Sequence, residues 1–404
     1  MLKNIFLLHL FMAAAFANVL QDAINSAPEG AVIKLPAGVY QGNIVIDKPL
    51  SIVGKEEGVV IDGENNGTVV RVNSSYVTIK NVKIINSGSM HHQQDAGIAI
   101  NNAEQCEVSD VVIDDCLFGI DMQMTNNSII QNNTIYSKDL ELGLRGDGLR
   151  LWYSNDNLIK KNSLIKSRDM VVWYSHGNTI EENYGEYCRY SLHFMYAGKN
   201  YVRNNTYNYN SVGIFFMYSQ DAIATGNVVK SSLGATGMGI GFKEISNFTV
   251  EDNTVLYCAK GFYIDRSPFQ PDTNNFVNRN KILYNAEAMH FHSVSENNII
   301  KENIFLGNID DIINDSTGTR TYTNLFEGNY WDNYEGFDKN KDGFGDTPHK
   351  IYQYADKLWM YNPNVKFFYG SPVISLLNFL GKLAPFSEPV FLIEDLKPVI
   401  KVKS

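Results

Sequence analysis

The sequence is poor in cysteine, in basic residues and in long apolar runs. Cysteine accounts for only 4 of the 404 residues, and 34 lysines and arginines stand against 44 acidic residues, for a net charge of −10. Nucleic-acid binding requires a basic stripe or patch, so this acidic balance predicts no nucleic-acid partner. A transmembrane helix requires about 20 consecutive apolar residues. The apolar run at the N-terminus is shorter, so we expect a soluble mature protein without a membrane anchor.

The N-terminus has the three parts of a secretory signal peptide. The segment MLKNIFLLHLFMAAAFA places a lysine before an apolar run and ends in Ala15-Phe16-Ala17. Such a segment is removed during export. We therefore expect residues 1–17 to be cleaved after Ala17, and the mature chain to begin with a short helix that caps the domain.

The rest of the chain is built from a repeat. Two similar hexamers, LHFMYA (192–197) and IFFMYS (214–219), lie 22 residues apart, and the same spacing recurs along the chain. Periods in the low twenties indicate stacked units, and the leucine framework of a leucine-rich repeat is missing. The residues that open the repeated strands are Gly97, Gly119, Gly148, Met170, Ser191, Gly213, Gly239, Gly261 and Ala288.

In each repeat the first and third residues after this marker are apolar, which is the period of a strand with one buried face. Each coil needs its neighbours to cover that face. The sequence therefore predicts an all-β fold, a parallel β-helix over residues 18–335 that we expect to be right-handed, followed by a tail without repeats (336–404). A second marker predicts turns and amide ladders: Asn81, Asp110, Asn133, Asn162, Asn183, Asn205, Asn227, Asn253, Asn280, Asn303 and Asn329.

Export favours disulfides, but this register argues against them. Cys116, Cys188 and Cys258 each precede a strand marker by three residues and lie three coils apart. Coils stack about 4.8 Å apart, so successive thiols in this column are about 14 Å apart, beyond the roughly 7 Å limit for a bridge. We expect free, buried cysteines.

The residues between the buried positions of each strand should point outward, and around the middle of the chain they are unusually apolar. His193, Met195 and Met217 fall among them, in neighbouring coils. An imidazole with two thioethers is a soft ligand set that suits Cu⁺, so these three residues are a candidate copper site. Exposed apolar surface also marks partner contacts, and we predict such a contact at Trp152, Tyr174 and Phe215.

Other groups compete with this site. Met90, His91 and His92 form one loop cluster, and His290 and His292 alternate on another outward face. Many β-helices act on polysaccharides. Asp147 and Asp169 each precede a strand marker in adjacent coils, so we expect them roughly 5 Å apart, a spacing that would suit a retaining hydrolase. The alternative is that these aspartates pair with nearby arginines and tie the turns together.

The tail carries two further candidate sites. In DKNKDGFGD, Asp338, Asn340, Asp342 and Asp346 follow the front of a calcium loop, although His349 at the twelfth position excludes an EF-hand. The segment 372–383 predicts an amphipathic helix too short to cross a membrane. We expect it to dock on a membrane partner or to cover the end of the β-helix, through the apolar residues Val373, Leu376, Leu377 and Leu380.

Four segments resemble the NosD family, the periplasmic maturation proteins of nitrous oxide reductase: GDGLRLWYS (146–154), RYSLHFMYA (189–197), VGIFFMYS (212–219) and GNYWDNYEGFDKNKDGFGDTP (328–348). The resemblance spans nearly the whole mature chain. It implies a non-enzymatic role in supplying copper to the reductase, in the periplasm and peripherally at the inner membrane. The partners it implies are an ABC transporter permease with its ATPase, a copper-chaperone lipoprotein and the reductase. It strengthens the copper interpretation of His193, and a docking face that binds no metal remains the alternative.

Overall fold

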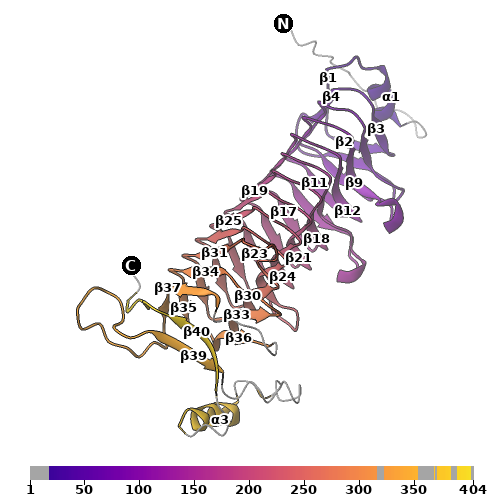
Figure 1. Cartoon of the computed structure of the whole chain (residues 1–404). Helices are drawn as coiled ribbons and strands as arrows, with labels where there is room; N and C mark the ends of the chain where they lie inside the picture. The colour runs from indigo at the N-terminus through magenta and orange to yellow at the C-terminus, as the bar shows by residue number, and fades with distance from the viewer. Residues whose placement is uncertain (1–17, 316–322, 354–367, 369–370, 384–388, 402–404) are drawn as a thin grey trace. The chain divides into compact units, whose positions relative to one another are not determined.

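The computed structural model describes residues 18–315, 323–353, 368, 371–383 and 389–401, so the predicted signal peptide (1–17) lies outside the described residues. The chain divides into two compact units, residues 1–223 and 224–404. Each unit is a solenoid in which a coil contributes one short strand to each of three sheets of parallel strands (Figure 1). The predicted all-β parallel β-helix is confirmed, and its handedness stays a prediction.

In the first unit the strands of each sheet follow one another in chain order. One sheet contains β1 (Ala31–Leu35), β4 (Leu50–Gly54), β7 (Thr78–Lys80), β10 (Glu107–Ser109), β13 (Ile129–Gln131), β16 (Leu158–Lys160), β19 (Thr179–Glu181) and β22 (Tyr201–Arg203). The second contains β2 (Gly38–Gln41), β5 (Val59–Asp62), β8 (Lys83–Ile85), β11 (Val112–Cys116), β14 (Thr134–Ser137), β17 (Ser163–Ile165), β20 (Tyr184–Glu186) and β23 (Thr206–Asn208). The third contains β3 (Ile44–Ile46), β6 (Val70–Val72), β9 (Ala96–Asn101), β12 (Phe118–Gln123), β15 (Leu149–Trp152), β18 (Asp169–Trp173), β21 (Tyr190–Met195) and β24 (Val212–Met217). Two 3₁₀ turns, η1 (His91–Gln93) and η2 (Leu142–Leu144), lie in its longer loops, and β25 (Ile223–Thr225) lies at the boundary of the units.

The second unit repeats the arrangement. Its first sheet contains β28 (Thr249–Glu251), β31 (Asn275–Asn278), β34 (Asn298–Lys301) and β37 (Leu325–Glu327). Its second sheet contains β26 (Val228–Lys230), β29 (Thr254–Leu256), β32 (Lys281–Leu283), β35 (Ile304–Leu306) and β38 (Tyr330–Trp331). Its third sheet contains β27 (Met238–Lys243), β30 (Lys260–Asp265), β33 (Glu287–His292) and β36 (Asp310–Asn314). The tail adds β39 (His349–Gln353), the helix α3 (Pro372–Leu383) and β40 (Val390–Asp395).

The alternation of apolar residues places the core inside each coil. In β21, Leu192 and Phe194 are 0% and 1% exposed, because alternate side chains of a strand point to opposite faces. His193 lies between them on the outer face. Burying one such large apolar side chain contributes about 2 kcal/mol, and the same inner positions repeat from coil to coil.

The predicted register of strand β18 is one residue away from its true register. Leu149 pairs with Met170, and Leu151 with Val172, so Met170 and Val172 face the core. The prediction that Val171 and Trp173 point inward is therefore wrong. The marker position of this coil holds Asp169 instead of a small residue, and the apolar run MVVW reads equally well in either register.

Asparagine ladders run through both units as predicted, but they do not supply the turn conformation. Asn162 Nδ2 donates to Asn183 Oδ1 at 3.0 Å, and Asn183 Nδ2 donates to Asn205 Oδ1 at 3.0 Å. The left-handed residue is the one before each rung, such as Lys161 and Glu182.

Two of the assigned asparagine markers do not belong to the ladder. Asn81 and Asp110 have positive φ and align with Asn132 instead of Asn133 through the backbone bonds of the turns. They occupy the turn position, where asparagine and aspartate tolerate left-handed backbone.

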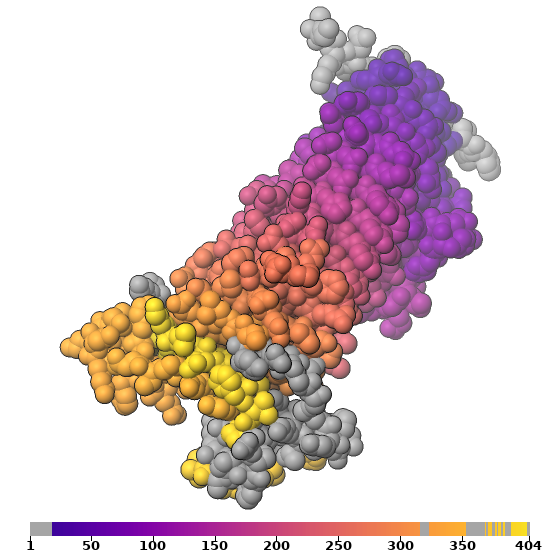
Figure 2. All heavy atoms as spheres, in the orientation of Figure 1, coloured from indigo at the N-terminus to yellow at the C-terminus, as the bar shows by residue number. Residues whose placement is uncertain are grey.

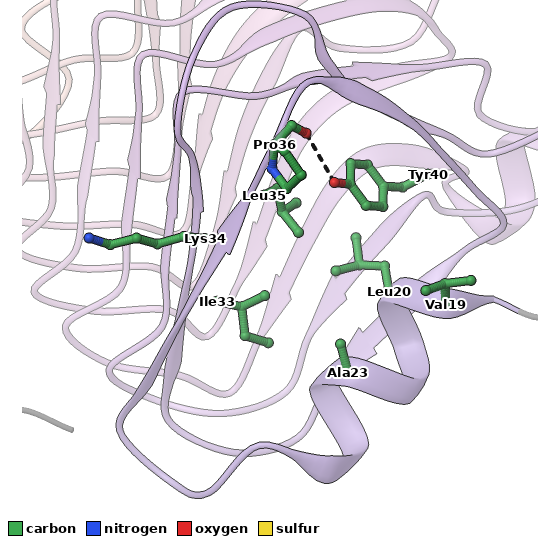
Figure 3. A pocket seen from close by; sticks show the side chains of 8 residues that line it. All are labelled: Val19, Leu20, Ala23, Ile33, Lys34, Leu35, Pro36 and Tyr40. Atoms are coloured by element: carbon green, nitrogen blue, oxygen red, sulfur yellow. Dashed lines mark hydrogen bonds between the residues drawn. The ribbon is translucent and has the colours of Figure 1, made fainter. Parts of the chain in front are cut away.

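The helix α1 (Val19–Ser26) packs on the first coils of its unit, as the sequence predicts. The Asn18 side chain caps it by accepting a hydrogen bond from the Gln21 N–H at 3.1 Å. Leu20 points from the helix toward Ile33 and Leu35 of β1 (Figure 3). The cavity left between them is only about 10 Å³, too small for more than one water molecule, so this side of the helix is closely packed on β1.

The four cysteines are buried and free, as the register predicts. Burial raises the pKa of Cys116 and of Cys188 to about 12. These thiols therefore stay protonated and act as small apolar side chains.

The tail returns to its unit through β40. This strand pairs with β37 and with β39, and Figure 2 shows it as a yellow band against the orange residues before it. Asp395, 0% exposed, accepts hydrogen bonds from Asn329 Nδ2 at 2.8 Å and from Trp331 Nε1 at 3.0 Å. A carboxylate from the tail thus ends the asparagine ladder of the second unit.

Candidate functional site

The candidate site lies on the outer face of the third sheet in the first unit. Parallel pairing places residues at the same position of successive strands side by side, about 4.8 Å apart. Two such columns of outward residues run across β12, β15, β18, β21 and β24. The first column is Asp121, Arg150, Val171, His193 and Phe215, and the second is Gln123, Trp152, Trp173, Met195 and Met217.

His193 and Met217 lie in contact across adjacent coils. His193 Nε2 is 3.2 Å from Met217 Sδ. Met195 is the direct neighbour of Met217 in the sheet, and both methionines are half-buried. The register thus brings together the three residues that the sequence selects as a soft ligand set.

The His193 ring is flanked by two residues that the sequence does not connect with it. Tyr190, at the start of the same strand, stacks on the imidazole with a centroid distance of 4.6 Å. On the other side, His193 Nδ1 lies 3.9 Å from Asp169 Oδ2, too far for a hydrogen bond. His193 is only 9% exposed, so access to Nε2 is from the side of the methionines.

The aromatic surface differs from the prediction at two of its three residues. Trp152 faces outward, half-buried, with its ring 4.5 Å from that of Trp173. Tyr174 lies in the following turn instead of the strand, because the register of β18 is shifted by one residue. Phe215 also lies on the outer face, but it is only 7% exposed because it packs against Tyr190. Little of its side chain is therefore available for contact with a partner.

Tyr174 belongs to a ladder of stacked tyrosines. Its ring stacks on Tyr153 at 4.9 Å and on Tyr196 at 5.1 Å, and Tyr196 stacks on Tyr218 at 4.8 Å. Each of these residues has positive φ, which turns its side chain outward at the same corner of successive coils. Tyr153 and Tyr196 are exposed, so an aromatic edge borders the site.

The two aspartates proposed for a hydrolase are engaged with arginines. Asp147 Oδ1 accepts from Arg168 Nε at 2.9 Å, and Asp169 Oδ1 accepts from Arg189 Nε at 3.0 Å. Their assignment to the same position of adjacent coils is wrong, since Leu149 pairs with Met170 and Asp169 therefore aligns with Gly148. These ion pairs tie successive turns together, as the alternative interpretation expects.

The two carboxyl groups differ in their electrostatics. Burial raises the pKa of Asp147 despite the charge of Arg168. Burial acts in the same direction on Asp169, but contacts with His193 and Arg189 lower its pKa below the usual value. Asp169 is therefore held as an anion beside the His193 ring.

The acidic loop of the tail is folded on its own backbone. Asp338 Oδ2 accepts from the Gly343 N–H at 2.9 Å, and Asp342 Oδ1 accepts from the Phe344 N–H at 2.9 Å. Asn340 Nδ2 donates to Asp342 Oδ2 at 3.0 Å, and Asp346 Oδ2 accepts from the Lys339 N–H at 2.7 Å. These side-chain oxygens therefore stabilise the turns of the loop, and calcium binding there stays a prediction.

The helix α3 presents much of its apolar surface to solvent. Val373 and Leu376 are 64% and 56% exposed, and Leu377 and Leu380 are 40% and 39% exposed. None of the helices that the structure describes is long and apolar enough to cross a membrane. These four predicted docking residues are exposed, and whether they dock on a partner or cover the end of the β-helix stays a prediction.

A family model described as "Periplasmic copper-binding protein (NosD)" matches residues 135–336, half of the chain. The chain belongs to the NosD family. The matched range contains His193, Met195 and Met217, and it contains neither α3 nor most of the acidic loop.

Two curated NosD relatives cover most of the chain. The protein named "Probable ABC transporter binding protein NosD" from Stutzerimonas stutzeri is 26% identical over 404 residues, covering 91% of this chain and 86% of its own length. The protein of the same name from Pseudomonas aeruginosa is 28% identical, covering 87% and 84%.

Two solved structures of similar fold are a glucanase and an epimerase. The catalytic unit of an α-1,3-glucanase from Streptomyces thermodiastaticus has a TM-score of 0.62 at 14% identity, covering 78% of this chain and 65% of its own. The A-module of a mannuronan C-5 epimerase from Azotobacter vinelandii has a TM-score of 0.51 at 12% identity, covering 73% and 90%. At such identity the likeness shows the β-solenoid alone, because unrelated functions share folds.

Proposed function

We propose that this NosD-family protein is a non-enzymatic periplasmic accessory in the supply of copper to nitrous oxide reductase, and that it holds Cu⁺ in transit at His193, Met217 and Met195. The observation that carries the proposal is the 3.2 Å separation of His193 Nε2 and Met217 Sδ on an outward face. One ion can bind both atoms at this separation. Soft thioether sulfur selects Cu⁺ over hard cations such as Mg²⁺ and Ca²⁺.

The surroundings of His193 suit a transient cargo. Asp169 is held as an anion 3.9 Å from His193 Nδ1, and a negative charge at this distance attracts a cation bound at the ring. Tyr190 closes one face of the ring, whereas the half-buried methionines leave the other approach open. A copper ion would enter and leave past Met195 and Met217.

The proposal is tested by anaerobic titration of the mature protein with Cu⁺ against a chromophoric competitor. Met217→Leu keeps the volume and removes the sulfur, and we expect it to weaken Cu⁺ binding at least tenfold. His193→Ala should do the same. Met124→Leu, at an exposed methionine outside the site, is the matched control. Equal affinity in all four proteins would leave a docking scaffold without a metal.

We further propose that α3 docks on the permease of an ABC transporter, which works with its ATPase. The support is the exposure of Val373, Leu376, Leu377 and Leu380 along one short helix, since helix-in-groove binding uses residues spaced by three and four positions. The partner would hold the protein at the inner membrane. We assign the aromatic surface around Trp152 and the tyrosine ladder to contact with the copper-chaperone lipoprotein or with the reductase.

Docking is tested by co-purification with the transporter. Replacing Leu376 and Leu380 with glutamine should abolish co-purification without lowering the melting temperature. The control is Leu233→Gln, at a loop leucine that is 62% exposed. Loss of thermal stability in the double variant would instead show that the helix covers part of its own unit. Deleting the whole tail is a poorer experiment, because it also removes Asp395 from the end of the ladder.

A further inference from the structure

The second unit carries another group of metal-binding side chains on the outer face of its third sheet. Parallel pairing places Tyr263 beside His290 and Asp265 beside His292. Phe291 pairs with Asn314 of β36, so the next residue, Asp315, falls beside His292. The sequence shows the two histidines, but only this pairing adds Asp315, which follows the last residue of its strand.

Asp315 bridges the two imidazoles. His290 Nε2 lies 2.9 Å from Asp315 Oδ2, and His292 Nδ1 lies 2.8 Å from Asp315 Oδ1. One ligand atom from each residue lies within 4.8 Å of the others. In the part of the chain that the structure describes, no other three histidine, cysteine or acidic side chains come so close together.

A fourth residue orients the buried histidine. His290 Nδ1 lies 2.5 Å from Glu287 Oε2, on the same strand. A carboxylate on one imidazole nitrogen leaves the other to bind metal, which is the usual outer-shell arrangement of histidine ligands. The Tyr263 ring stacks against His292 at 5.9 Å and limits its movement. His290 is 2% exposed, so its orientation is set by the fold.

We propose that His290 Nε2, His292 Nδ1 and the Asp315 carboxylate bind one divalent transition-metal ion of the Zn²⁺ and Cu²⁺ class, with Glu287 positioning His290. Two imidazoles and a carboxylate are three of the ligands found in zinc sites with an open fourth position. The side chains of His292 and Asp315 are 43% and 32% exposed, so an ion reaches the site from solvent. Binding replaces the hydrogen bonds that Asp315 makes to both rings.

The donor atoms decide the kind of ion. Nitrogen and oxygen ligands favour borderline divalent cations, and among these Cu²⁺ binds most tightly. No thioether is part of the group, so it has no preference for Cu⁺. The site is therefore distinct in chemistry from His193 and Met217, and it does not depend on the function proposed above.

The test is calorimetric titration of the metal-free mature protein with Zn²⁺, repeated with Cu²⁺ while recording the electron paramagnetic resonance spectrum. We expect one Zn²⁺ per chain and a Cu²⁺ signal with nitrogen coupling. His292→Ala and Asp315→Asn lie at the solvent-exposed side of the site and should each weaken Zn²⁺ binding at least tenfold. Glu287→Gln should weaken it about tenfold, as outer-shell changes do.

Two controls separate this site from adventitious binding. His92→Ala removes an exposed histidine of the first unit and should change nothing. His176→Ala, at another exposed histidine of the first unit, should also leave Zn²⁺ binding intact. The proposal is overturned if the wild-type protein binds no stoichiometric Zn²⁺, or if His292→Ala and Asp315→Asn bind it as the wild type does. Either result would make the group a hydrogen-bonded His–Asp–His network only.

Discussion

The two units use the same scaffold to present different ligands. In the first, β21 and β24 bring a histidine nitrogen to 3.2 Å from a methionine sulfur. In the second, β33 and the end of β36 bring two histidines onto one carboxylate at 2.8–2.9 Å. Both groups occupy the same outward positions of the third sheet. The coil fixes the spacing of side chains, and the residue types at those positions determine which ion can bind.

The largest expected effect is a separation of metal preferences between the units. Met217→His would convert the first group to two imidazoles, and we expect its preference for Cu⁺ over Cu²⁺ to fall by about 100-fold, or about 2.7 kcal/mol. Replacing a soft sulfur ligand with nitrogen is the physical reason. Competition titrations with both oxidation states measure it. An unchanged ratio would mean that Met217 is not a ligand.

Removing one asparagine from the ladder should destabilise both units by a similar amount. Asn183 and Asn280 are buried rungs whose amides donate to a backbone carbonyl and to the next asparagine. Replacing either with alanine leaves buried groups unsatisfied, which costs about 1–3 kcal/mol. We expect similar losses for Asn183→Ala and Asn280→Ala, measured by urea unfolding. A much smaller loss in one unit would show that its ladder is dispensable.

The stability of the second unit should also depend on pH through one buried carboxyl group. Burial and then the neighbouring charge of Asp332 raise the pKa of Asp311 to about 7 from 3.8. The stabilisation from the protonated carboxyl is present below about pH 4 and is lost as the pH rises through 7. With about 1.4 kcal/mol for each pKa unit, the loss reaches at most a few kcal/mol.

Asp311→Asn removes this titration. The stability of the variant relative to wild type should therefore rise between pH 4 and pH 7, as measured by unfolding at several pH values. Asp272→Asn, at an exposed aspartate of the same unit, is the matched control. A constant difference for Asp311→Asn would contradict the raised pKa.

The smallest expected effect is a change in melting temperature caused by the acidic loop. This loop offers only hard oxygen ligands, in contrast to the groups around His193 and His290. If the loop binds Ca²⁺, Asp342→Ala should lower the melting temperature by a few degrees in calcium and by less in EDTA, since a ligand stabilises only the form that binds it. Equal losses in both buffers would assign Asp342 to turn formation through its bond to Phe344.

Local sequence patterns predicted much of the β-helix fold but fewer of the side-chain contacts in the candidate sites. The period, the inward apolar pairs, the free cysteines and the capping helix follow from spacing and alternation. The errors arise where the alternation of apolar and polar residues is ambiguous. In the run MVVW every residue is apolar, so the predicted positions of Val171, Trp173 and Tyr174 are one residue away from their true positions. Asp315 was missed for a different reason, because it lies at the end of a strand and only its pairing with β33 shows its neighbours.

The sequence by itself determined that the chain coils, which faces its strands bury, and that it carries soft and acidic side chains at outward positions. A repeat with a period of two inside each strand leaves few other ways to bury its apolar residues. The tertiary structure decided the contacts that depend on the exact register of neighbouring coils. The length of each loop sets the register of the next coil, and a shift of one residue turns a side chain from the core to the surface. That register brings Met217 to His193, binds Asp147 and Asp169 to arginines, and places Asp315 between two histidines.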